Sequence, residues 1–498
     1  MVINKRKIAA FTAVLVTAAT LFFYRSQSSG GWSFSQYQNQ KLTWVKCGGP
    51  FLCTDVTVPV NYSNPGGERM QLALVKYPAT DKKKRLGSLF VNPGGPGASG
   101  VQYGYAAEYI VSKKILSAYD IVGFDPRGVG GSSAERCLTN SETDKLIEAN
   151  GPPVAGLSLS TLEEASKLLA TRCEEKLGER LKYLGSVDVV RDMDLMRKVL
   201  GDEKLNFLGK SYGTYLGLVY TSMFPKNVGR FVLDGVVDPN LNANELNKAQ
   251  ALGFEIALDA FLTDCIGKKD CFFQGTLEQA RDEITRLQDL VAKEPLSGKD
   301  GRIATESILV LAMVASLYDS ETGWSELNKA LKDVYKGKGG KLFDLVNSYV
   351  VRDAKGRYPS NENEIAYIVN CLDRTDDASP KRLAADAERF ASFAPHFGPY
   401  IAWSTLPCHY WPYEPVRPPV PLNGKGAPDF VVIGTTRDPA TPYSWATEVT
   451  ARFPSAYLIT ADGDGHTGHG RGSTCVDGAV DIFLLTGKLP ARPLRCSL

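Results

Sequence analysis

The sequence predicts an α/β protein in which a mostly parallel central sheet carries an inserted helical cap. Three features of the 498-residue chain lead to this prediction. Short apolar runs alternate with helical stretches up to Pro239, a helical period dominates from 240 to 400, and strand-like runs return after 400. Such alternation favours parallel strands, whose carboxyl edge is where ligands bind and where a cap would lie. We therefore expect a core of residues 31–239 and 401–498 and a cap of residues 240–400.

Residues 1–30 are typical of a targeting segment. A basic stretch at 5–7 precedes an apolar run at 8–24, and polar residues follow it. This order indicates a signal peptide or an uncleaved signal anchor, with a buried core helix as the alternative. The run is at the short end of what spans a membrane. The mature domain is therefore expected outside the cytoplasm, secreted or attached to the membrane through this segment.

The composition is that of an ordinary globular protein. Hydrophobic residues make up 43% and charged residues 22%, which argues against wholesale disorder. The formal net charge of +2 gives no reason to expect a nucleic-acid partner.

The cysteines favour disulfides. There are ten, an even number, and none form a CxxC pair, so a zinc ribbon or a redox site is not indicated. One sequence does not determine the connectivity, and some cysteines staying free is the alternative. Pairing of sequence neighbours would give 47–53, 137–173, 265–271, 371–408 and 475–496.

The elements expected in the first part of the core follow the apolar pattern. Strand-like runs at 71–78 and 87–95 flank a charged turn at 81–85, which we expect to be solvated. A third apolar run at 119–133 leads into a glycine-rich loop. The remaining elements are a helix at 187–201, a strand, turn and helix at 204–225, and a strand at 230–239.

Helical patterns fill the cap region. The stretch 276–293 begins with a capping box and has apolar residues at spacings of three or four. Beyond the cap, strand-like runs at 429–442 and 456–470 enclose a helix-like stretch at 443–453. The other expected cap helices are 243–264, 305–318, 324–335 and 379–391, with a flexible loop at 336–341.

The pentapeptide GKSYG at 209–213 matches the pattern G-x-S-x-G and places Ser211 between an apolar strand and a helix. The glycines are needed because such a nucleophile lies on a strained turn where side chains would collide. A phosphate-binding loop would require a glycine at position 204, which is Lys204. A tight turn whose serine has no role is the remaining alternative.

The stretch NPGGPG at 92–97 is a candidate oxyanion hole. It follows an apolar strand, and bare glycines let backbone N–H groups approach a developing oxyanion; one such donor is worth about 10²–10³ in rate. Gly94 and Gly95 are therefore candidate donors. The N–H of Tyr212, the residue after the nucleophile, is expected as a second donor. A plain turn is the alternative.

The acid should follow the serine and precede the histidine along the chain. Asp438 lies just past an apolar strand, in a loop at the sheet edge where a carboxylate can orient an imidazole. Asp234 and Asp238 also follow a strand and are the alternatives.

Of the four histidines, only His466 and His469 follow Asp438, because His396 and His409 precede it. His466 comes directly after a strand and a tight loop and is the candidate base, whereas His469 is expected to pack. A pair of histidines in a glycine-rich loop lacks the helix face and the further ligands of a metal site, so we expect no metal.

Several stretches together resemble the secreted tripeptidyl-aminopeptidase branch of the α/β-hydrolase superfamily, which is allied to prolyl iminopeptidases. The resemblance runs from about Trp44 to Cys496. The chain departs from the family at Lys210, where a small or aromatic residue is more usual, and it lacks a lipobox cysteine. The stretches are NPGGPGASG, YDIVGFDPRGVGGS, NFLGKSYGTYLG, LDGVVDP, IVNCLD, GTTRDPATP and GDGHTGHG…STCVDGAV…FLLTGKLP.

The resemblance implies an α/β-hydrolase fold with a triad of Ser211, Asp438 and His466. It also implies a serine exopeptidase that releases short peptides, of tripeptide length, from free N-termini through an acyl-enzyme. We expect a monomer that acts on peptides without a cofactor. A carboxylesterase or lipase with the same triad is one alternative, and an inactive hydrolase fold used for binding is another.

An aminopeptidase must also bind the substrate ammonium, which calls for a carboxylate beside the pocket. The cap stretch NENEIAYIVNCLDR offers Glu362, Glu364 and Asp373. The family-like NCLD pattern favours Asp373, with Glu364 as the second candidate. A solvated helix face or a salt bridge within the cap is the alternative for both.

Overall fold

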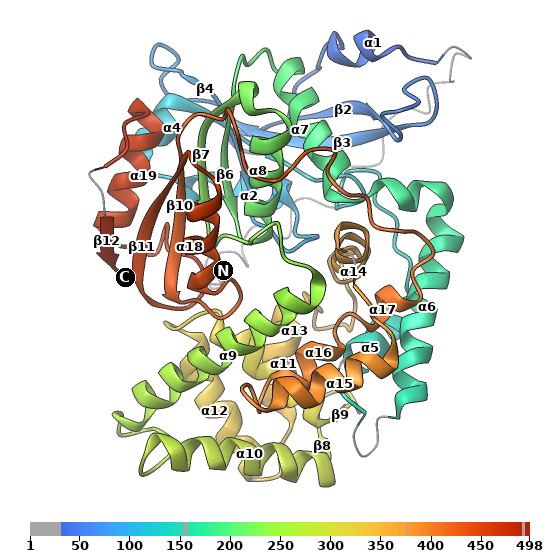
Figure 1. The fold of residues 1–498 in the computed structure, drawn as a ribbon, viewed down its shortest axis with the longest axis vertical. Coiled ribbons are helices and arrows are strands. Elements are labelled where there is room, and N and C mark those ends of the chain that lie inside the picture. Colours follow the sequence, from blue (N-terminus) through green and yellow to red (C-terminus); the bar gives the residue numbers. More distant parts are fainter. Residues whose placement is uncertain (1–30, 150, 154–157, 375, 491–493) are drawn as a thin grey trace.

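The computed structural model describes residues 31–149, 151–153, 158–374, 376–490 and 494–498. The targeting segment expected at 1–30 lies outside these ranges. Across the described ranges, no helix combines the length and the apolar character needed to cross a membrane. Figure 1 shows a sheet with helices on both sides in the upper part of the molecule and a group of helices below it.

The described residues form a ten-stranded central sheet. In the order in which they pair, its strands are β1 (Val45–Lys46), β2 (Leu52–Pro59), β3 (Arg69–Tyr77), β5 (Tyr119–Phe124), β4 (Gly87–Asn92), β6 (Leu205–Lys210), β7 (Val228–Asp234), β10 (Phe430–Arg437), β11 (Ala456–Asp464) and β12 (Leu494–Ser497). The pairs from β1 to β5 are antiparallel, and all pairs from β5 to β12 are parallel. The prediction of a mostly parallel sheet is confirmed.

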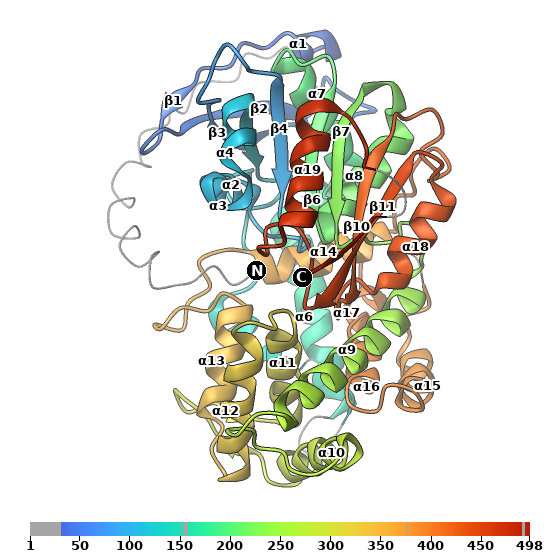
Figure 2. The ribbon, with the colours of Figure 1, turned by 90° about the vertical axis from the view of Figure 1, so that its left-hand side faces the viewer.

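Helices cover both faces of the sheet (Figure 2). Phe90 of β4 packs with one helix layer, whereas Leu89 and Val91 pack with the other, because successive side chains of a strand point to opposite faces. A strand enclosed in this way is apolar on both sides. One layer holds α2 (Gly100–Tyr105), α3 (Ala107–Ile110), α4 (Lys113–Ala118) and α19 (Thr474–Thr486); the other holds α7 (Ser186–Val199), α8 (Tyr212–Met223) and α18 (Tyr443–Arg452), with α1 (Phe34–Gln38) beside α7.

A helical cap is inserted between β7 and β10, as predicted. Ile284, Leu287 and Val291, from the stripe expected in 276–293, are buried in its core. Figure 2 shows the cap below the carboxyl ends of the parallel strands. Its elements are α9 (Ala243–Ile266), α10 (Leu277–Lys293), β8 (Leu296–Ser297), β9 (Ile303–Ala304), α11 (Glu306–Leu317), α12 (Gly323–Tyr335), α13 (Gly340–Tyr349), α14 (Glu362–Asp373), α15 (Pro380–Ala391), α16 (Gly398–Trp403) and α17 (Leu406–His409).

Two helices from the first half of the chain lie against the cap. They are α5 (Asn140–Glu148) and α6 (Leu159–Leu177), which follow β5 in sequence. Leu162 of α6 packs in one apolar cluster with Trp403 of α16, and Figure 1 shows both helices beside α15, α16 and α17. The sequence analysis assigned both helices to the core segment 31–239. Their packing against the cap could not be predicted, because the order of elements along the chain does not show which apolar surface a helix contacts.

All ten cysteines form disulfides, and the pairing is that of sequence neighbours. Cys371–Cys408 fastens α14 to α17, and Cys475–Cys496 fastens α19 to the edge strand β12. Disulfides persist in oxidising compartments, so these bridges agree with a location outside the cytoplasm. The pairs are Cys47–Cys53, Cys137–Cys173, Cys265–Cys271, Cys371–Cys408 and Cys475–Cys496.

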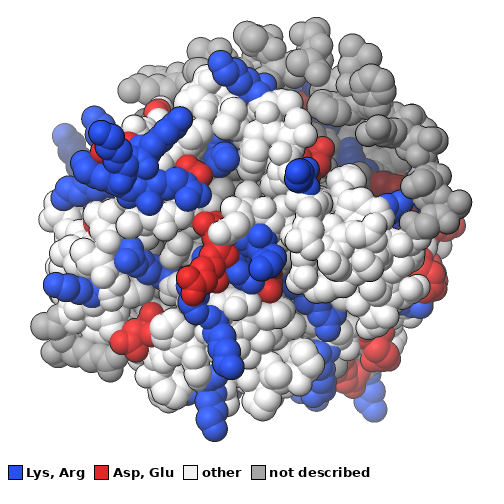
Figure 3. Space-filling model, turned by 90° about the horizontal axis from the view of Figure 1, so that it is seen from above, with Lys and Arg blue, Asp and Glu red and all other residues white. Residues whose placement is uncertain are grey.

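The charged turn at 81–85 joins β3 to β4, and its lysines are exposed as expected. Lys84 pairs with Asp81 at 3.2 Å and Arg85 with Asp120 at 2.9 Å. Figure 3 looks down on this end of the molecule and shows basic side chains gathered on one part of the surface, with acidic ones among them. The Lys84–Asp81 pair is exposed and adds little stability, whereas Asp120, the partner of Arg85, is buried.

Candidate active site

Ser211 lies at the sharp turn between β6 and α8. Its backbone has φ 54° and ψ −128°, a conformation that residues with a side chain rarely adopt. The two glycines of the motif make the turn possible. A Cβ on Gly213 would lie 2.7 Å from Asn92 Oδ1, and a Cβ on Gly209 would lie 2.7 Å from the Gly213 carbonyl oxygen. The G-x-S-x-G pattern is thus explained by close backbone packing around the serine.

Asp438, in the loop after β10, holds His466 in a fixed orientation. Both carboxylate oxygens lie 2.9 Å from His466 Nδ1. The carboxylate also accepts the N–H groups of Ala440 (3.0 Å), Thr441 (2.8 Å) and Thr467 (3.0 Å). The Thr441 hydroxyl donates to it as well, at 3.0 Å. A carboxylate fixed by so many donors can orient an imidazole and stabilise an imidazolium.

The surroundings of Asp438 keep it ionised. Burial acts to raise its pKa, but the charge of His466 and the hydrogen bonds to the carboxylate together lower the pKa below its usual value. The second imidazole nitrogen, Nε2, is buried and has no hydrogen-bond partner within the described ranges. Ser211 and His466 line the same cavity, and Nε2 is the imidazole nitrogen that Asp438 leaves unbound.

The glycine-rich loop 92–97 packs against the serine turn. A Cβ on Gly94 would lie 2.9 Å from the nitrogen of Tyr212, so only glycine permits this approach. The Gly94 N–H already donates to Asn92 Oδ1 at 2.9 Å, which leaves it no role as an oxyanion donor. The N–H groups of Gly95 and Tyr212 have no acceptor in the part of the chain that the structure describes. These two groups remain the candidate oxyanion donors.

A buried ion pair lies next to the serine turn. Lys210 Nζ lies 3.3 Å from Asp234 Oδ2, and the two side chains are 7% and 0% exposed. Asp234 also accepts the N–H groups of Gly468 (2.8 Å) and His469 (3.0 Å). Its backbone carbonyl accepts the N–H of Ser211 at 2.9 Å, and Lys210 donates to the His469 carbonyl at 2.5 Å. The unusual lysine of the motif therefore helps to tie the serine turn to the histidine loop.

The two alternative acids are occupied elsewhere. The Asp234 carboxylate is taken up by the contacts just described, and Asp238 forms an ion pair with Arg452 at 2.8 Å. The geometry therefore favours Asp438 as the partner of His466.

Two of the three other histidines have surroundings typical of packing residues, whereas His409 is exposed and lines the cavity. His469 is 4% exposed, and burial, with the nearby charge of Lys210, lowers its pKa to about 4. His396 lies in the cap, where its Nδ1 is 2.9 Å from Glu255. No group of side chains in the described ranges has the composition of a metal site.

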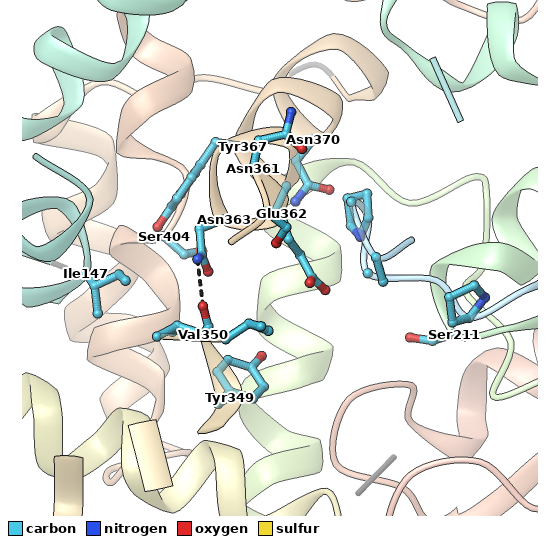
Figure 4. Close-up of a pocket in the computed structure, with 18 of the residues that line it drawn as sticks. Ile147, Ser211, Tyr349, Val350, Asn361, Glu362, Asn363, Tyr367, Asn370 and Ser404 are labelled. Carbon is cyan, nitrogen blue, oxygen red and sulfur yellow. Dashed lines mark hydrogen bonds between the residues drawn. The ribbon is translucent and has the colours of Figure 1, made fainter. Parts of the chain in front are cut away.

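A cavity of about 2340 Å³ lies between the core and the cap. Pockets for small molecules usually measure about 300–1,000 Å³, so this one has room for a longer ligand. Ser211 and His466 belong to the core side of its wall, and Phe254, Tyr349 and Glu362 to the cap side. Figure 4 shows Glu362 at the start of α14, reaching into the space that faces Ser211.

Neither carboxylate favoured by the sequence for ammonium binding lies in the cavity wall. Glu364 accepts the backbone N–H groups of Cys137 (2.6 Å) and Leu138 (3.3 Å) and so anchors α14 to the start of α5. Asp373 accepts the N–H (2.8 Å) and the hydroxyl (2.5 Å) of Ser186, at the start of α7. Both carboxylates have a structural task that explains their position.

Glu362 is the carboxylate of this stretch that does line the cavity. Burial raises its pKa, since a charged group with little access to water is disfavoured. Its neighbours fix the start of α14, because Asn361 donates to the Gly128 carbonyl (2.7 Å) and Asn363 to the Val350 carbonyl (2.9 Å, Figure 4). A cation bound beside Glu362 would stabilise the charged form of the carboxylate, which burial disfavours.

Two family models match the chain. One, described as alpha/beta hydrolase fold, matches residues 87–291, which include Ser211. The other, described as TAP-like protein, matches residues 394–496, which include Asp438 and His466.

Several curated proteins are similar over nearly the whole chain. The chain is 32% identical to Serine protease Hip1 of Mycobacterium tuberculosis, with 91% of this chain and 88% of that protein covered. It is 32% identical to Tripeptidyl aminopeptidase of Streptomyces lividans, with 92% and 86% covered. It is 36% identical to Carboxylesterase B of Mycobacterium tuberculosis, with 89% and 86% covered.

Proposed function

Because the chain belongs to the TAP-like branch of the α/β-hydrolase superfamily, we propose that this serine hydrolase is an exopeptidase that releases short peptides from free N-termini. Ser211 is the nucleophile, His466 the base and Asp438 the acid. The cavity holds the N-terminal part of the substrate. Tripeptides are the proposed product, in line with the name of the Streptomyces relative.

In the first half of the reaction, His466 Nε2 takes the proton of the Ser211 hydroxyl while the serine oxygen attacks the scissile carbonyl. The N–H groups of Gly95 and Tyr212 donate to the oxyanion that forms. Asp438, bonded to Nδ1, stabilises the imidazolium. The imidazolium then protonates the leaving nitrogen, the C–N bond breaks, and the N-terminal fragment stays on the serine as an ester.

In the second half of the reaction, a water molecule takes the place of the serine hydroxyl as the nucleophile. A water molecule gives a proton to His466 and attacks the ester carbonyl, and the same donors hold the second oxyanion. The imidazolium returns its proton to the Ser211 oxygen as the ester bond breaks. The short peptide leaves as a carboxylic acid and the serine is restored.

The position of Glu362 is the observation that carries the peptidase proposal. A carboxylate and a substrate ammonium form a charge-assisted hydrogen bond, which is stronger than a neutral one. Glu362 lies in the wall of the cavity that Ser211 also lines. An N-terminus bound by Glu362 would lie in the same cavity as the scissile bond at Ser211, so the cap would select substrates with a free N-terminus.

A carboxylesterase is the second candidate function. The triad chemistry is the same for an ester, and the relative named Carboxylesterase B is 36% identical. Phe254, Val310 and Leu311 give the cap side of the cavity apolar surface that an acyl chain could contact.

The deciding experiment compares three substrates: a tripeptide anilide with a free N-terminus, its N-acetylated form, and a p-nitrophenyl ester. We expect the free peptide to be cleaved well and the acetylated peptide poorly, because acetylation removes the ammonium. Ser211→Ala should lower turnover of every substrate by about 10⁴-fold or more without changing the melting temperature. Equal cleavage of the free and blocked peptides favours the esterase, and turnover retained by Ser211→Ala refutes the nucleophile.

Glu362→Gln tests the ammonium site. Loss of a hydrogen bond to a charged group costs about 1.5–3 kcal/mol, so KM for the free tripeptide anilide should rise by about 10- to 100-fold while ester turnover is unchanged. Glu326→Gln is the matched control, because Glu326 also lines the cavity but is exposed. A similar rise in the control would mean that overall negative charge, and not Glu362, attracts the substrate.

We also propose that the protein acts outside the cytoplasm as a monomer. Five disulfides support the compartment, and the proposed site needs no residue from a second copy. Attachment to a membrane through residues 1–30 stays a prediction from the sequence.

A further inference from the structure

Tyr318 brings the cap into direct contact with His466. It follows α11, and its carbonyl accepts the backbone N–H of His466 at 3.0 Å. Its ring also stands edge-on to the imidazole, with ring centres 5.2 Å apart and planes at 83°. The imidazole is therefore held at Nδ1 by Asp438, from the core, and is flanked by an aromatic ring from the cap.

Polar contacts fasten the same junction. The Ser320 hydroxyl donates to the Asp464 carbonyl at 3.2 Å. Arg471 donates to the Ser320 hydroxyl (3.1 Å) and to the Asp464 carbonyl (2.7 Å). Gly465, with φ 91°, permits the close approach, since a Cβ there would lie 3.1 Å from the Tyr318 carbonyl oxygen. The chain that follows α11 and the histidine loop thus form one hydrogen-bonded unit.

On its other side, Tyr318 reaches the part of the cavity wall that holds Glu362. The centres of the Tyr318 and Tyr349 rings lie 5.7 Å apart. Burial raises the pKa of Tyr349, and the nearby charge of Glu362 adds to the rise. Figure 4 shows Tyr349 and Glu362 on the same side of the cavity. Tyr318 therefore lies between the imidazole, which its ring contacts, and the part of the cavity wall that holds Tyr349 and Glu362.

We propose that Tyr318 is a positioning residue, which keeps the His466 imidazole in its productive orientation as long as the cap is docked on the core. This inference rests on the roles proposed for Ser211 and His466. The hydrogen bonds to Asp438 fix one edge of the imidazole but leave it able to tilt, and the Tyr318 ring blocks the tilt. A displacement of about 1 Å at a reacting group can cost about 10²-fold in rate, so the contact matters for proton transfer.

Two substitutions separate the ring of Tyr318 from its hydroxyl. Tyr318→Leu removes the edge contact with the imidazole, whereas Tyr318→Phe keeps that contact and removes only the hydroxyl. The matched control is Tyr358→Leu. Tyr358 also belongs to the apolar core of the cap, at 4% exposure, and its hydroxyl donates to Asp144 at 2.6 Å, but it does not line the cavity.

Two measurements report on the base. One is kcat and KM for the p-nitrophenyl ester and for the tripeptide anilide. The other is the rate at which a fluorophosphonate probe labels Ser211, which needs the serine and its base but no peptide specificity. We expect Tyr318→Leu to lower kcat and the labelling rate by about 10- to 100-fold, with a smaller change in KM. Tyr318→Phe should stay within about threefold of the wild type, and so should Tyr358→Leu.

The inference is overturned if Tyr318→Leu keeps kcat and the labelling rate within about threefold of the wild type, or if its loss lies in KM alone. It is also overturned if Tyr358→Leu loses as much as Tyr318→Leu, since cap packing in general would then explain the effect. Ser211→Ala keeps this test apart from the proposed function. If Ser211→Ala still turns over ester and peptide, the proposed function fails; if it is inactive while Tyr318→Leu is normal, only the positioning role fails.

Discussion

His466 and His469 lie three residues apart in one loop but have opposite surroundings. His466 directs Nδ1 to Asp438 and lines the cavity. His469 is enclosed by protein, and its hydrogen bonds to Asp234 and Lys210 are made by its backbone N–H and carbonyl. A change of side chain at position 469 therefore leaves those hydrogen bonds in place, whereas a change at position 466 removes the imidazole that faces the cavity.

We expect His466→Ala to lower kcat by about 10³-fold or more, because the serine loses its base. His469→Leu should lower kcat by less than about tenfold, because the hydrogen bonds at this position are made by the backbone and remain. The measurement is kcat for the p-nitrophenyl ester, with each variant's melting temperature as the check on folding. Equal losses would mean that the base has been assigned to the wrong histidine.

The same His469→Leu variant tests whether His469 makes the free energy of unfolding depend on pH. The pKa of His469 is about 4 in the native protein and 6.5 in its ordinary state. Above pH 6.5 neither the native nor the unfolded chain binds a proton there. As the pH falls from 6.5 to about 4, the unfolded chain binds a proton at His469 but the native protein does not. The free energy of unfolding of the wild type should therefore fall by up to about 3 kcal/mol. Denaturant titrations at pH 7 and pH 5 should show a smaller loss in the variant.

The sequence identified the candidate triad because its signals are local: a glycine-bounded serine, and an aspartate and a histidine that each follow an apolar strand. It did not single out Glu362. Glu362 and Glu364 are two residues apart on one helix, which places them on nearly opposite faces. Which face borders the cavity depends on how α14 is rotated against the core, and the sequence pattern near its start does not record that rotation.

At the scale of elements, the sequence predicted the strands and helices whose apolar period is strong. The helix expected at 276–293 is α10 (Leu277–Lys293), and the strand expected at 230–239 is β7 (Val228–Asp234). The packing of α6 against the cap was not predicted, because it depends on contacts between segments far apart in the chain. The cap boundaries at 240 and 400 stay a prediction.

The bridge between α14 and α17 offers a test of one element. Closing a loop of 37 residues is worth about 3–4 kcal/mol in the chain-entropy account. The double variant Cys371→Ser, Cys408→Ser should therefore be less stable, and it should raise KM for the free tripeptide anilide more than KM for the ester, because α14 carries Glu362. Denaturant titration and the two KM values provide the measurement.

The control for this prediction is the double variant Cys47→Ser, Cys53→Ser. Its bridge spans only 6 residues and joins β1 to β2, so the expected loss is about 2 kcal/mol with no change in either KM. A selective rise in KM for the peptide in both variants would contradict the link between the bridge and the ammonium site.

At the scale of the whole molecule, the cavity is formed by the core and the cap, and the sequence predicts each of them from a different pattern. The sheet supplies Ser211 and His466, and the cap supplies Glu362 and Tyr318. The alternation of strands and helices predicted the sheet, and the helical block predicted the cap. Their relative orientation could not be predicted, because it is set by surface contacts between the two bodies and not by a repeating pattern along the chain.

Reduction of the disulfides should destabilise the molecule as a whole. The five bridges are spread over the core, the cap and the edge of the sheet, and each contributes about 2–4 kcal/mol. We expect full reduction to lower the melting temperature by more than about 10 °C, measured by thermal unfolding with and without reductant. Alkylation of all ten thiols verifies the reduction. An unchanged melting temperature in a fully alkylated sample would show that packing alone holds the fold.

The order of the site residues along the chain has a consequence for timing. Ser211 lies on one side of the cap insertion, and Asp438 and His466 lie on the other. During synthesis, a growing chain exposes the serine long before the aspartate and the histidine exist, and β12, with its bridge to α19, comes later still. If the triad works as proposed, a chain that ends before β11 is complete lacks the base and is inactive, and activity begins only when the last part of the sheet has folded into place.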